Sequence, residues 1–77
     1  MSTTLEVHAW RPDDAVIVGG GGLLFLVDLE SGSTDVISPT TEQNLYARGY
    51  WNDDVPAAAK SAALLAAALK SASQEGT

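Results

Sequence analysis

Few side chains in this sequence have the chemistry of a catalytic or metal-binding site. His8 is the only histidine, and an imidazole acts as a base or a ligand only beside a positioned nucleophile or a second ligand. Because His8 falls on the polar side of an alternating segment, we expect it to be exposed to solvent. The pairs Asp13-Asp14 and Asp53-Asp54 lack the spaced oxygen ligands of a calcium loop, so we expect them to form turns and cap helices. The sequence therefore predicts no metal, no cofactor and no enzymatic activity.

Two further patterns bear on nucleotide binding, and neither supports it. The run Gly19–Gly22 is followed by Leu23-Leu24, where a phosphate-binding loop needs a lysine and then a serine or threonine. An apolar, strand-like segment follows the glycines, so we interpret them as a tight hairpin turn. Aromatic rings can stack on bases, but few basic residues accompany them, so we expect them to pack in the core and the linker. These residues are Trp10, Tyr46, Tyr50 and Trp51.

The charge balance excludes two classes of partner. The chain has 10 acidic and 4 basic residues, which gives a formal net charge of −6. Nucleic acids and anionic membrane surfaces both require a basic face, so we predict neither as a partner. A basic peptide or protein is compatible with this charge, although solubility is the simpler explanation.

The length of 77 residues predicts one domain, 1–77, with a small core. The absence of cysteine excludes disulfides and fits a cytoplasmic location. There is no basic segment followed by an apolar core at the N-terminus, and no apolar run of about 18 residues. We therefore expect neither a signal peptide nor a membrane span, and small domains of this kind often gain stability from a partner or from self-association.

The first half of the chain, about 3–38, predicts strands. Thr4–Trp10 alternates polar and apolar residues, and Ala15–Val18 is rich in β-branched residues. Leu23–Leu29 and Thr34–Ile37 follow, separated by a turn in which Gly32 is expected to be left-handed. This spacing indicates an antiparallel meander of three to four strands.

The second half predicts helices at about 39–48 and 55–72. Ser38 or Thr40 can cap the first helix, and Pro39 suits its first turn. An apolar stripe on the second helix could face the sheet or a partner helix, and we favour the sheet. The stripe consists of Ala58, Ala62, Leu65, Leu69 and Ala72. Residues 73–77 are expected to be a frayed tail. Together these elements predict an α+β domain with an exposed sheet edge, where a peptide can add as a strand.

Several short segments, taken in order, resemble the PqqD-like domains, the RiPP precursor peptide recognition elements that include the stand-alone proteins of lasso-peptide clusters. These segments are Arg11-Pro12, Val16-Ile17-Val18, Leu24–Gly32 and Ser38-Pro39-Thr40-Thr41. The resemblance implies a winged helix-turn-helix-like fold of three strands and three helices. It also implies a non-catalytic protein that binds a precursor leader peptide and presents it to a modifying enzyme or protease.

By that resemblance, Thr34, Asp35, Val36 and Ile37 would pair with the leader, and Leu65 and Leu69 would be its hydrophobic anchors. This sequence differs from the family pattern in two ways. Ser38 stands where the family has asparagine, and one long helix follows Gly49 where the family has two. Either 55–72 breaks into two helices, or the last helix is missing and a second chain completes the groove. The alternative is a structural or regulatory homo-oligomer assembled through the Ala/Leu helix.

Overall fold

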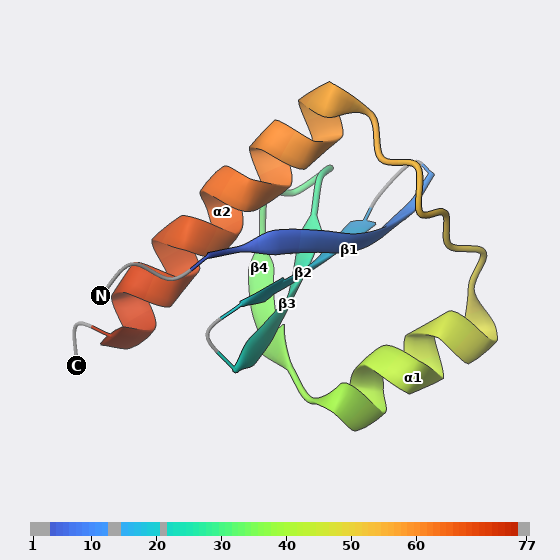
Figure 1. Ribbon diagram of the computed structural model, residues 1–77, viewed down its shortest axis with the longest axis horizontal. Helices are drawn as coiled ribbons and strands as arrows, with labels where there is room; N and C mark the ends of the chain where they lie inside the picture. Colours follow the sequence, from blue (N-terminus) through green and yellow to red (C-terminus); the bar gives the residue numbers. More distant parts are fainter. Residues whose placement is uncertain (1–3, 13–14, 21, 76–77) are drawn as a thin grey trace.

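The computed structural model describes residues 4–12, 15–20 and 22–75. In chain order the elements are β1 (Glu6–Arg11), β2 (Ala15–Gly20), β3 (Leu23–Asp28), β4 (Thr34–Ile37), α1 (Pro39–Arg48) and α2 (Ala57–Glu75). The strands form an antiparallel sheet in the order β1-β2-β3-β4, and the helices lie on opposite sides of it (Figure 1). The predicted α+β class, a meander followed by C-terminal helices, is confirmed. The winged helix-turn-helix description remains a prediction.

The glycine run forms the hairpin between β2 and β3. Gly20 pairs with Leu23, which places Gly22 in the connection between the two strands. Gly22 has a φ of +79°, a conformation that glycine adopts without steric cost. Gly20 lies so close to the segment that precedes β1 that a Cβ atom there would be 2.5 Å from the carbonyl oxygen of Thr4. The glycines are therefore needed both for the turn and for close contact between neighbouring segments. The turn predicted at Asp13-Asp14 lies outside the described residues.

A β-bulge in β1 changes the expected alternation of side chains. Val7 pairs with Val18 and Ala9 with Ile17, which leaves His8 as the extra residue. A bulge of this kind redirects the side chains that follow it. Ala9 is consequently buried, and Trp10 packs against the core on the α2 side. The prediction of a regular alternation over 4–10 is therefore wrong beyond Val7.

Both ends of α1 match the sequence signals. The hydroxyl oxygen of Ser38 accepts a hydrogen bond from the amide of Thr41 at 3.1 Å, which satisfies one of the free amides at the helix start. At the other end, the amide of Gly49 donates to the carbonyl of Leu45 at 2.9 Å. The predicted bounds of 39–48 are confirmed, and Ser38 rather than Thr40 is the cap.

The second helix is continuous from Ala57 to Glu75. Residues 55–72 therefore do not break into two helices, and within the described residues no third helix follows. The predicted frayed tail over 73–77 is wrong for 73–75, because residues with adequate helix propensity extend the alanine-rich segment. The residue before the start of α2 is Pro56, whose carbonyl accepts a hydrogen bond from the amide of Lys60. Asp53 and Asp54 lie further ahead, so neither aspartate occupies the cap position of this helix.

The core lies between the sheet and one face of α2. Its buried members are Val16, Val18, Phe25, Val27, Ala63 and Ala67. The small alanines let the helix backbone approach the sheet closely, which favours dense packing. Leu65 and Leu69 are instead 64% and 66% exposed, so the expectation that the stripe containing them faces the sheet is wrong.

Candidate functional site

The outer edge of β4 carries unpaired backbone groups. In antiparallel strands, residues alternate between pairs that exchange backbone hydrogen bonds and pairs that do not. The amide of Asp28 donates to the carbonyl of Ser33 at 2.8 Å, and this register continues to Leu26↔Asp35 and Leu24↔Ile37. Asp35 and Ile37 therefore bond toward β3, while Thr34 and Val36 direct their amide and carbonyl groups outward. Among the described residues, no other segment forms backbone hydrogen bonds with this edge.

The side chains of the same two residues lie on the α2 face of the sheet. Val36 is opposite Phe25 and Thr34 is opposite Val27, and both partners belong to the core beneath α2. Directly opposite residues share a face of the sheet. Val36 nevertheless remains 42% exposed because β4 is an edge strand. An added strand would therefore meet an apolar surface as well as free backbone groups.

A hollow of about 310 Å³ lies beside this edge, between the β3–β4 turn, β4 and the C-terminal half of α2. Its described lining residues are Gly32, Thr34, Ala66, Leu69, Lys70 and Ser73. Among them, Lys70 is the one with a charged side chain. The fold thus brings Thr34 of the edge strand and Leu69 of the helix to one cavity, although 35 positions separate them.

The site residues predicted from the sequence are therefore divided in space. Thr34, Val36 and Leu69 lie on the α2 side of the edge, whereas Asp35 and Ile37 belong to the opposite face of the sheet. Leu65 is exposed and is not among the residues that line the hollow. Sequence reasoning did not find Ala66, Lys70 and Ser73. Ala66 and Ser73 lie three residues before and four residues after Leu69, and this spacing is the signal that could have identified them. Lys70 directly follows Leu69, so helical spacing from Leu69 could not have identified it.

A second cluster joins β1 to α1. Nδ1 of His8 lies 3.2 Å from Oε2 of Glu42, and the hydroxyl of Tyr46 donates to the same oxygen at 2.8 Å. The predicted exposure of His8 is confirmed, with 38% of its side chain accessible against 14% for Glu42. Since 34 positions separate His8 from Glu42, no local pattern could reveal this contact.

Tyr46 is a hydrogen-bond donor in this cluster. Burial raises its pKa far above the usual value of a phenol, and the hydrogen bond to Glu42 and the negative charges of Glu42 and Asp53 add to the effect. A phenol in such surroundings stays protonated at neutral pH. The cluster therefore acts as a connection that holds α1 against the sheet.

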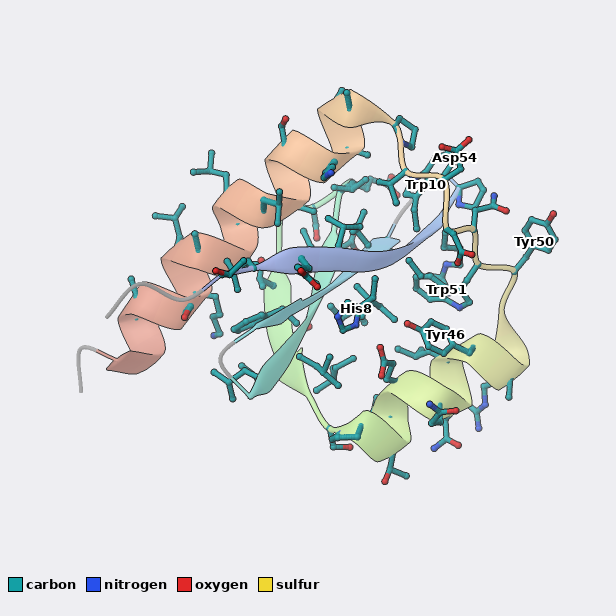
Figure 2. All side chains as sticks on the ribbon, viewed as in Figure 1. His8, Trp10, Tyr46, Tyr50, Trp51 and Asp54 are labelled. Atoms are coloured by element: carbon teal, nitrogen blue, oxygen red, sulfur yellow. The ribbon has the colours of Figure 1, made fainter. Side chains whose placement is uncertain are left out.

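The aromatic residues of the linker have different roles. Trp51 donates its indole N–H to the carbonyl of Leu45 at 2.9 Å and meets Tyr46 edge to face with centroids 5.9 Å apart. Trp51 thus fixes the linker, as predicted. Tyr50 is 75% exposed and projects away from the body of the molecule (Figure 2), so the expectation that it also packs against the core is wrong.

Comparison of the chain with family models, with curated proteins and with solved structures finds no match. Within the described residues, no group of three His, Cys, Asp or Glu side chains is placed to hold a metal ion. The helices described in the structure are too short or too polar to cross a membrane.

Proposed function

We propose that the protein is a non-enzymatic peptide-binding module that receives a precursor leader peptide by strand addition at β4 and presents it to a modifying enzyme or protease. The observation that carries the proposal is the outward direction of the backbone groups of Thr34 and Val36 at an edge that adjoins an apolar hollow. Strand addition needs both features, because the backbone bonds supply affinity and the side-chain pockets supply selectivity.

The geometry of the edge defines what the guest peptide must provide. A guest strand would exchange hydrogen bonds with Thr34 and Val36, and residues two apart in the guest would face α2. One such side chain could enter the hollow against Leu69 and Ala66. Lys70 would favour an acidic group nearby, since its ammonium has no acidic neighbour among the described lining residues.

The identity of the guest as a leader peptide rests on the resemblance to the PqqD-like domains. The resemblance covers about residues 10–48, which include β2, β3 and β4. Within this proposal, α2 supplies the helical side of the groove, where the family has its last helix. RiPP biosynthesis, a modifying enzyme or protease as second partner, and a cytoplasmic location belong to the same proposal.

Replacing Val36 with proline tests strand addition. Proline removes an outward amide but no bond to β3, so the fold should survive. Titration with a candidate precursor leader peptide that binds the unmodified chain should show at least about a tenfold loss of affinity, which corresponds to one buried carbonyl of the guest left unsatisfied. Val36→Ala, which keeps the amide, should lose less. Circular dichroism checks the fold, and unchanged affinity of a folded Val36→Pro variant would contradict strand addition.

One observation favours the alternative function, a structural or regulatory homo-oligomer. The exposed leucines Leu65 and Leu69 lie on one stripe of α2 with exposed alanines at Ala58, Ala62 and Ala72. Alternating steps of four and three residues are the spacing that lets two helices pack along their length. In this alternative, α2 pairs with its copy in a second chain, and sedimentation distinguishes the two functions.

A further inference from the structure

An aromatic and acidic hollow lies on the opposite side of the sheet from the α2 core, between β1, α1 and the linker that joins the helices (Figure 2). It has a volume of about 450 Å³. Its described lining residues are His8, Ala9, Tyr46, Gly49, Tyr50, Trp51 and Asp53. Because β1 and β4 are the two edges of the sheet, this hollow is distinct from the proposed peptide groove.

The walls of this hollow are held in place before any ligand binds. Trp10 and Asn52 exchange two backbone hydrogen bonds, of 2.9 and 2.8 Å, which attach the linker to β1. The bond from Trp51 to Leu45 and its edge-to-face contact with Tyr46 fix the orientation of the indole. A preorganised site loses little conformational entropy on binding. Tyr50, at the rim, is the most exposed large apolar side chain among the described residues.

Acidic groups line and adjoin the hollow, and one basic group, the guanidinium of Arg11, lies over the ring of Trp51. Asp53 lines it, and the carboxylate of Glu42 lies beneath Tyr46. The same two carboxylates, Glu42 and Asp53, add to the raised pKa of Tyr46, whose first cause is burial. A neighbouring hollow of about 500 Å³ shares Asp53 and adds Glu6 and Asp54, with Lys60 as its basic residue. The whole chain carries a formal charge of −6, so its long-range field attracts a basic partner.

We propose that this hollow binds an arginine side chain on the surface of a partner protein. A guanidinium stacks on aromatic rings and pairs with carboxylates at the same time, and the hollow offers both kinds of group together. The chain itself contains one example of this chemistry, because the guanidinium of Arg11 lies 5.3 Å from the centroid of the Trp51 ring. Because Arg11 already lies over the Trp51 ring, the guest arginine would stack on the exposed ring of Tyr50 and direct its charge toward Asp53.

Titration of the full chain with Nα-acetyl-arginine amide, followed by NMR, tests this proposal. We expect saturable shifts in the millimolar range at the indole N–H of Trp51 and at the amides of Gly49 to Asp53. Nα-acetyl-citrulline amide, which has a similar shape without the charge, should give no saturable shifts. Asp53→Asn should weaken arginine binding by about threefold, as expected for the loss of one exposed ion pair.

Two variants separate the site from the fold and from the peptide groove. Tyr50→Ala should weaken binding while it preserves the spectrum of the free protein, because its side chain is 75% exposed. Val36→Pro should bind the arginine probe as the unmodified chain does. Equal shifts with arginine and citrulline, shifts that map elsewhere, or full affinity in the Asp53→Asn variant would each overturn the proposal, whatever the outcome at β4.

Discussion

At the scale of single residues, Asp28 organises the turn that leads into the edge strand. Its Oδ1 accepts hydrogen bonds from the amides of Glu30 at 2.9 Å and Ser31 at 3.3 Å. Its own backbone carbonyl accepts the amide of Gly32 at 2.8 Å, and Gly32 has a φ of +80°. The carboxylate thus provides a hydrogen-bond acceptor for turn amides that have few other acceptors.

The two amide hydrogen bonds, from Ser31 first and then Glu30, lower the pKa of Asp28 below its ordinary value of 3.8. A lowered pKa means that the ionised form stabilises the folded state. This contribution is present above about pH 4 and disappears as the pH falls through the lowered pKa of the folded protein.

Asp28→Ala should therefore lower the free energy of unfolding at neutral pH but not at strongly acidic pH. Urea unfolding at a series of pH values measures the difference from the unmodified chain. Asp28→Asn is the matched control, since its amide oxygen can still accept both bonds but does not titrate in this range. A difference between the chain and Asp28→Ala that stays constant from neutral to strongly acidic pH would rule out the titration of Asp28 as its source.

At the scale of elements, α2 presents alanines to the sheet and leucines to solvent. Ala63 and Ala67 are fully buried, whereas Leu65 and Leu69 are about two-thirds exposed, at 64% and 66%. The leucines follow the alanines by two residues, which at about 100° per residue places the two surfaces on nearly opposite sides of the helix, about 160° apart. An alanine-rich helix is apolar on most of its circumference, so its sequence does not determine which side faces the core.

A pair of substitutions measures this orientation. Ala67→Leu adds atoms to a filled space and should lower the free energy of unfolding by about 1–3 kcal/mol. Leu65→Ala removes an exposed side chain and should change it by less than about 0.5 kcal/mol. Urea unfolding of both variants gives the comparison. The reverse order of effects would mean that the leucines, and not the alanines, pack on the sheet.

At the scale of the whole molecule, the two surfaces that we propose for partners lie at opposite edges of the sheet. The β4 edge offers free backbone groups, while the β1 side is partly closed by the linker through Trp10 and Asn52. A domain of this size buries a limited core and is only marginally stable. Binding at either surface should therefore raise its apparent stability.

Sedimentation distinguishes the proposed peptide-recognition module from the alternative homo-oligomer. For the recognition module we expect a monomer of 8.0 kDa that gains mass only when peptide is added. Its unfolding midpoint should not depend on protein concentration. A larger mass without peptide, abolished by Leu65→Glu, would favour the homo-oligomer. Leu65 suits this test because it lies on the exposed stripe but does not line the β4 hollow.

Local signals were sufficient for most of the elements. The strand runs, the turn at Gly32, the hairpin at the glycines and the limits of α1 were all predictable, because each depends on neighbours in the chain. The bulge at His8 was not predictable, since it exists only through the pairing of β1 with β2. The extension of α2 to Glu75 was missed because helix ends have weak sequence signals.

The sequence alone determined the type and order of the elements, and it identified β4 as a strand of a meander. Tertiary structure decided which side of α2 meets the sheet, that Thr34 and Leu69 share one hollow, and that His8 contacts Glu42. The physical reason is that propensity and periodicity act over a few residues. Packing instead depends on shape and on backbone pairing between segments that lie far apart in the chain.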